Sequence, residues 1–119
     1  MAKILVVEDE KPIARPISLK LKFSGFDVCN AYDGQEALEV LKKETFDLIL
    51  LDIIMPKMNG FEVLAQLKAQ GNKTPIIVIS NLSQDEDIEK VKSFGAFYFV
   101  KSNIADEALV GQIKTMLKI

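Results

Sequence analysis

The stretch that decides the fold is Leu48-Ile49-Leu50-Leu51-Asp52-Ile53-Ile54-Met55-Pro56-Lys57-Met58-Asn59-Gly60. Four consecutive apolar residues lead into a carboxylate, and a segment with Pro56 and Gly60 follows. An apolar run bounded by turn-forming residues is typical of a parallel strand that is covered on both faces. Asp52 is therefore predicted at the carboxyl end of a buried strand, which is the edge where open α/β sheets bind ligands.

Three other apolar runs also end in polar residues. The residues that follow the runs at 4–7, 76–79 and 97–100 are, in order, Glu8-Asp9-Glu10, Ser80 and Lys101. If all four runs are parallel strands, their ends bring carboxylates, a hydroxyl and an amine to one edge of the sheet. This combination suits a divalent cation and a phosphoryl group.

The whole chain alternates between strand and helix patterns. The expected strands lie near residues 3–8, 26–31, 47–52, 75–80 and 96–101, and the expected helices near 12–24, 34–44, 60–70, 84–94 and 104–117. Gly25, Gly71 and Gly95 fall where helices should end, and Pro16 should bend or delay the first helix. Five such units with short connections indicate right-handed crossovers and a doubly wound α/β sheet.

Length and composition limit the classes of protein to which this chain can belong. The 119 residues fit a single domain, 1–119. A net charge of −2 disfavours direct binding to nucleic acid, and no apolar run approaches the roughly 20 residues of a membrane span. The lone Cys29 and the absence of a signal-peptide pattern before the first strand suggest a cytoplasmic location. The chain has no His, which excludes acid–base chemistry by its own histidines.

The ordered set of strand-end residues resembles the receiver domain of two-component response regulators over the whole chain. The residues that carry the resemblance are Glu8-Asp9, Asp52 with Met55-Pro56 and Gly60, Ser80, and Tyr98 three residues before Lys101. The resemblance implies a flavodoxin-like, five-stranded parallel sheet of order 2-1-3-4-5 with five helices. In that order the first and third strands are neighbours, so Asp9 should lie beside Asp52.

A metal site is expected among these acids. Glu8, Asp9 and Asp52 would repel one another when packed together, so a cation is needed to keep them ionised. Oxygen ligands suit Mg²⁺, with Mn²⁺ able to substitute. The resemblance implies that Asp9, Asp52 and the backbone carbonyl of Ile54 bind the metal, and that Glu8 reaches it through water.

The resemblance also implies a phosphoacceptor that catalyses only its own phosphorylation and slow dephosphorylation. Asp52 would take a phosphoryl group from a histidine kinase or a histidine phosphotransfer protein, with Lys101 and Ser80 holding the added group. Ser80 would then move and Tyr98 would turn inward. The surface of the fourth helix, fifth strand and fifth helix would change for a downstream target, in a monomer or a phosphorylation-dependent homodimer.

The chain departs from the receiver pattern at two positions. Ser102 stands where receivers usually have Pro, and we expect a trans bond between Lys101 and Ser102 because a cis bond before a non-proline residue costs about 2.5–4 kcal/mol. Asn81 stands where a small residue is more common. The apolar residues Ile54 and Leu82 either shield an acyl phosphate from water or belong to ordinary loop packing.

Three other functions remain to be weighed. A pseudo-receiver would bind proteins without being phosphorylated, and the substitutions at Asn81 and Ser102 keep it open. An aspartate-nucleophile phosphatase would carry D-x-D, whereas this chain reads Asp52-Ile53-Ile54. A flavodoxin would need a Ser/Thr-rich phosphate loop in place of the acids after the first strand.

Overall fold

The computed structural model describes residues 2–53, 59–80, 85–100 and 107–118. Its five strands are β1 (Lys3–Val7), β2 (Asp27–Ala31), β3 (Leu48–Leu51), β4 (Ile76–Ser80) and β5 (Phe97–Val100). Its five helices are α1 (Lys11–Phe23), α2 (Gly34–Lys43), α3 (Gly60–Ala69), α4 (Asp85–Ser93) and α5 (Glu107–Leu117). The strands form one parallel sheet of order β2-β1-β3-β4-β5. The predicted fold class and strand order are confirmed.

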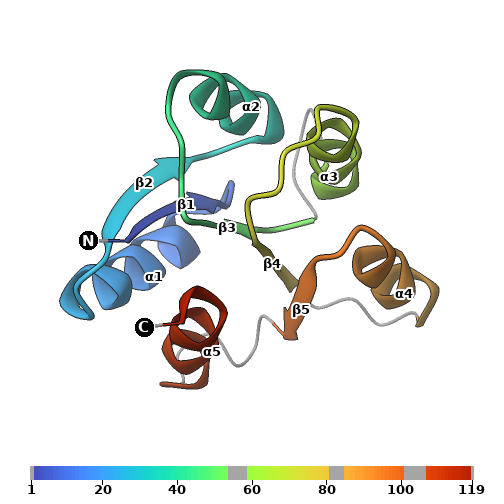
Figure 1. The fold of residues 1–119 in the computed structure, drawn as a ribbon. Coiled ribbons are helices and arrows are strands. Elements are labelled where there is room, and N and C mark those ends of the chain that lie inside the picture. Colours follow the sequence, from blue (N-terminus) through green and yellow to red (C-terminus); the bar gives the residue numbers. More distant parts are fainter. Residues whose placement is uncertain (1, 54–58, 81–84, 101–106, 119) are drawn as a thin grey trace.

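The helices cover both faces of the sheet, with α1 and α5 on one face and α2, α3 and α4 on the other (Figure 1). Side chains of a strand alternate between the two faces, and the buried residues divide accordingly. Leu5 and Ile49 pack in the cluster that includes residues of α2, α3 and α4, whereas Ile4 and Leu50 pack in the cluster with α1 and α5. The three middle strands are apolar on both faces because both faces are covered.

The register of the sheet places the ends of β1 and β3 side by side. Val7 lies opposite Leu51 in the pairing of these strands, and the Asp52 amide donates to the Val7 carbonyl at 3.0 Å. The Glu8 amide donates to the Ala31 carbonyl at 3.1 Å. The first acidic residue after β1 and the first after β3 are therefore held at the same edge by backbone hydrogen bonds.

The predicted delay of α1 by Pro16 is wrong. The helix begins at Lys11 and continues through Pro16 to Phe23. Pro16 lacks the amide that would donate to the Pro12 carbonyl, but both prolines lie on the exposed side of the helix, so water can reach that carbonyl. One missing hydrogen bond on a hydrated face does not interrupt a helix whose opposite face is buried.

Helix ends otherwise follow the sequence pattern. Gly25, Gly71 and Gly95 have φ angles of 95°, 71° and 80°, the left-handed conformation that ends a helix. At the start of α3, the Asn59 side chain accepts a hydrogen bond from the Glu62 amide at 3.1 Å. None of the helices in the described part of the chain combines the length and the apolar character that a membrane crossing needs.

Candidate functional site

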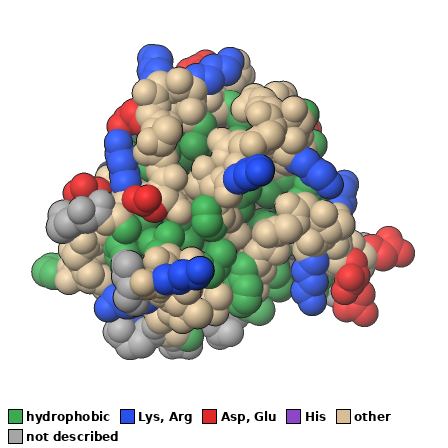
Figure 2. Space-filling model, viewed as in Figure 1, with side chains coloured by type: hydrophobic (Ala, Val, Ile, Leu, Met, Phe, Trp, Pro, Cys, Tyr) green, Lys and Arg blue, Asp and Glu red, His purple; other side chains and the backbone are tan. Residues whose placement is uncertain are grey.

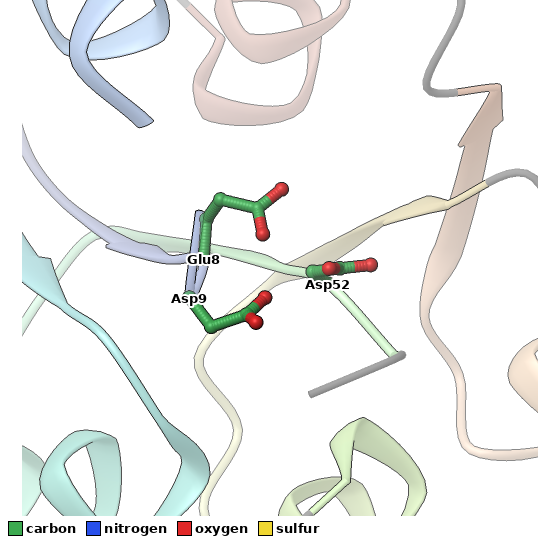
Figure 3. A group of neighbouring side chains, drawn as sticks. All are labelled: Glu8, Asp9 and Asp52. Carbon is green, nitrogen blue, oxygen red and sulfur yellow. The ribbon is translucent and has the colours of Figure 1, made fainter. Parts of the chain in front are cut away.

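Three acidic side chains meet where β1 and β3 end (Figure 3). Glu8, Asp9 and Asp52 each place a carboxylate oxygen within 4.8 Å of the oxygens offered by the other two, and Figure 3 shows the Asp9 carboxylate directed toward Asp52. The side chains of Glu8 and Asp52 are each 3% exposed. The structure therefore brings together the three predicted acids, as the order of the strands requires.

The cluster concentrates negative charge in a small, partly buried volume. At an effective dielectric constant of about 20, two unit charges 4.8 Å apart repel by about 3–4 kcal/mol. The Glu10 amide donates to Glu8 Oε2 at 3.3 Å, which orients one of the carboxylates. A purely oxygen donor set with this spacing fits a hard divalent cation.

Gly60 has a role in the site that the sequence pattern indicated only as a turn. Its amide donates to the Ile53 carbonyl at 2.8 Å. A Cβ atom on Gly60 would lie 2.6 Å from the Asp52 carbonyl oxygen and 2.6 Å from the Ile53 Cα atom. The first turn of α3 therefore packs directly on the backbone of Asp52, and glycine is needed for this close approach. Asn59, the capping residue immediately before it, is the signal that a helix starts here.

The predicted switch residues lie on neighbouring strands: Ser80 is the last residue of β4, and Tyr98 is the second residue of β5. The Tyr98 hydroxyl donates to the backbone carbonyl of Ser80 at 2.7 Å. The side chain of Ser80 is buried, and its Oγ atom has no hydrogen-bond partner within the described residues. A buried hydroxyl without a partner is unfavourable, so within the described residues the Ser80 hydroxyl remains available as a donor.

Several predicted site residues fall outside the described residues. They are Ile54, Asn81, Leu82, Lys101 and Ser102, and they include the predicted trans bond between Lys101 and Ser102. Their predicted roles stay predictions.

Comparisons with known proteins agree with this geometry. Residues 4–114 match the response regulator receiver domain. Response regulator ArlR of Staphylococcus saprophyticus is 40% identical over 118 residues, which are 99% of this chain and 53% of that protein. The probable transcriptional regulator ycf27 of Porphyridium aerugineum is 34% identical over 98% of this chain and 48% of its own length. The chain thus spans about half the length of these relatives.

Solved structures show the same fold. The Francisella response regulator 1452 receiver domain superposes with a TM-score of 0.91 and 34% identity, covering 99% of this chain and 98% of that one. The chemotaxis protein CheY4 of Vibrio cholerae superposes with a TM-score of 0.87 and 34% identity, covering 98% of both chains. With the acidic cluster at the ends of β1 and β3 and the match over residues 4–114, this chain belongs to the family of response regulator receiver domains.

Proposed function

We propose that residues 1–119 form a single phospho-accepting receiver domain in which Asp52 takes a phosphoryl group from a histidine kinase or a histidine phosphotransfer protein. The observation that carries the proposal is the cluster of Glu8, Asp9 and Asp52 at the carboxyl edge of the sheet. Burial of Asp52 beside two other acids has no evident benefit for folding, because it costs repulsion and desolvation. A covalent role that needs an anionic oxygen in a sheltered place explains it.

The acids fit Mg²⁺, with Mn²⁺ as a substitute. Asp9 and Asp52 would bind the ion directly, the Ile54 carbonyl would add a backbone oxygen, and Glu8 would act through water. The bound ion supplies positive charge that offsets the repulsion within the cluster and the charge of the incoming phosphoryl group. The spacing of the three carboxylates within 4.8 Å supports the acidic part of this ligand set.

Transfer from a phosphohistidine is then a simple exchange of bonds. An Asp52 carboxylate oxygen bonds to phosphorus as the P–N bond of the donor breaks, and the donor imidazole leaves with that electron pair. Lys101 would neutralise part of the phosphoryl charge, and the Ser80 hydroxyl would donate to a phosphoryl oxygen. The buried Ser80 Oγ, which lacks a partner within the described residues, supports its part in this step.

The phosphoryl group would act on a surface formed by α4, β5 and α5. It adds about −1.5 to −2 charges and three acceptors. Tyr98 already contacts the Ser80 carbonyl, so a movement of Ser80 reaches β5 directly. Phe97 and Val100 of β5 are each 40% exposed, which offers apolar contacts to a downstream target or to a second copy of the chain. A shift from 1:99 to 99:1 between two states needs about 5.5 kcal/mol of differential stabilisation.

Intact mass measurement tests the proposal. The wild-type protein treated with acetyl phosphate and Mg²⁺ should gain one phosphoryl group, about 80 Da, and Asp52→Ala or removal of Mg²⁺ should abolish the gain. An unmodified wild-type chain would favour the pseudo-receiver. Continuous hydrolysis of a generic phosphate ester, with no modified protein accumulating, would favour the phosphatase. The free Cys29 thiol is compatible with the cytoplasmic location that a histidine kinase donor requires.

A further inference from the structure

Helix α4 has little buried surface to hold it against the sheet. Val91 is the one buried residue among its nine, whereas α1 and α3 each bury four. Phe94, directly after the helix, is half-buried in the same cluster as Phe61 of α3. Within the described residues, contacts outside the core also join α4 to its neighbours.

Two lysine–ring contacts join α4 to α3, one in each direction. Lys90 of α4 holds its Nζ atom 4.4 Å from the centroid of the Phe61 ring, and Lys68 of α3 holds its Nζ atom 5.6 Å from the centroid of the Phe94 ring. Both distances lie within the range of a cation–π contact, about 6 Å. Figure 2 shows Lys or Arg side chains bordering hydrophobic surface where α3 and α4 lie. We call these four residues the α3–α4 clasp.

The two contacts of the clasp differ in how close they lie to Asp52. Phe61 is the second residue of α3 and follows Gly60, which packs on the backbone of Asp52 and donates to the Ile53 carbonyl. The Lys90–Phe61 contact therefore ends one residue from the turn that supports Asp52. The Lys68–Phe94 contact joins the last turn of α3 to the residue directly after α4, so it lies far along α3 from Asp52.

We propose that Lys90 is a positioning residue that holds α4 against the helix supporting Asp52, so that a change at Asp52 is passed to α4 through Phe61. The coupling to Asp52 rests on the proposed function, but the contact itself does not. Both lysines of the clasp are exposed, so the aliphatic part of Lys90 can lie over the ring while its ammonium group stays hydrated.

Hydrogen exchange of the α4 amides tests the contact in the protein without a phosphodonor. Lys90→Gln should speed exchange of residues 85–94 about two- to fivefold, the factor that corresponds to one exposed cation–π contact. Lys92→Gln is the matched control: it removes the same charge from the same last turn of α4, and no ring in the described residues lies under Lys92. Lys90→Arg, which keeps a cation over the ring, should restore slow exchange.

A double-mutant cycle separates the contact from a general loss of packing. Phe61→Leu should speed exchange of α4, and adding Lys90→Gln to it should change the rate by less than about twofold, because the partner is already gone. Equal exchange in Lys90→Gln and Lys92→Gln, or effects that multiply fully in the double variant, would overturn the proposal.

Treatment with acetyl phosphate and Mg²⁺ then tests the coupling. Wild type and Lys90→Gln should reach the same phosphorylated fraction by intact mass, since Lys90 takes no part in the chemistry. The change in α4 exchange on phosphorylation should be at least halved in Lys90→Gln, and an equal change would reject the coupling. Failure of the wild type to gain mass would overturn the proposed function. The comparison of hydrogen exchange in Lys90→Gln and Lys92→Gln would still show whether Lys90 holds α4.

Discussion

The two edges of the sheet use the same charged residue types in opposite ways. At the amino edge the Lys3 side chain pairs with Glu44, and the Lys3 amide donates to the Asp47 carboxylate at 2.7 Å. At the carboxyl edge Glu8, Asp9 and Asp52 face one another, and two of them are buried. Acids at the amino edge therefore have hydrogen-bonding partners, whereas the acids packed together at the carboxyl edge repel one another. The proposed function at the carboxyl edge accounts for this difference.

Gly60→Ala should produce the largest effect at the carboxyl edge. The added methyl group would lie 2.6 Å from the backbone of Asp52 and Ile53, and neither the strand end nor the helix can yield easily. We expect a loss of about 3 kcal/mol in the free energy of unfolding, measured by urea titration, together with slower phosphorylation of Asp52.

Gly111→Ala is the matched control. A Cβ atom at Gly111 of α5 would meet nothing within 4 Å, so the better helix propensity of alanine should raise stability by about 0.5–1 kcal/mol. If both variants lost similar amounts of stability, the contact of Gly60 with Asp52 would not be the cause of the loss in Gly60→Ala.

Replacing an aspartate by asparagine should change the free energy of unfolding in opposite directions at the two edges. In EDTA, Asp9→Asn should raise the free energy of unfolding by about 1–2 kcal/mol because it removes repulsion from the cluster. Asp47→Asn should lower it by about 0.5 kcal/mol because it weakens the hydrogen bond from the Lys3 amide. Urea titration of both variants measures the difference.

Added Mg²⁺ should distinguish the two edges further. Added Mg²⁺ should raise the melting temperature of the wild type and of Asp47→Asn, and should raise that of Asp9→Asn much less, since binding to the folded state alone gives the stabilisation. A destabilised Asp9→Asn in EDTA would contradict the assignment of repulsion to this cluster.

Tyr98→Phe should have a smaller effect: it should lower the free energy of unfolding by about 1 kcal/mol. It removes the hydrogen bond from the Tyr98 hydroxyl to the Ser80 carbonyl and leaves the ring in place. Tyr32→Phe serves as the control because the Tyr32 hydroxyl makes no hydrogen bond within the described residues, and it should change the free energy of unfolding by less than about 0.5 kcal/mol. In thermal melts, Tyr98→Phe should therefore have a lower melting temperature than Tyr32→Phe.

The smallest effect should come from the exposed pair at the amino edge. The side-chain hydrogen bond to Glu44 raises the pKa of Lys3 above its usual 10.5. Since the pKa is higher in the folded state, the stabilisation is complete below pH 10.5 and is lost as the pH rises through the folded-state pKa. The urea midpoint of the wild type should fall more between pH 9 and about pH 12 than that of Glu44→Gln. Parallel pH profiles would show that the pair contributes nothing measurable.

The sequence by itself determined the architecture and the position of the acids. Apolar runs such as residues 48–51 need cover on both faces, so strands that alternate with amphipathic helices permit little except a doubly wound sheet. An acid that follows such a run must lie at the carboxyl edge, whatever the side-chain packing. This is why Asp52 and Glu8 could be placed from their immediate neighbours in the chain.

Only the tertiary structure decided the contacts that join separate segments. The need for glycine at position 60 depends on how closely α3 approaches the backbone of Asp52, and the Lys90–Phe61 contact depends on the distance between two helices. Pro16 shows the same limit, because its effect on α1 depends on which side of the helix faces water. Local sequence specifies periodicity and turns, whereas the separation of packed elements is set jointly by all the side chains between them.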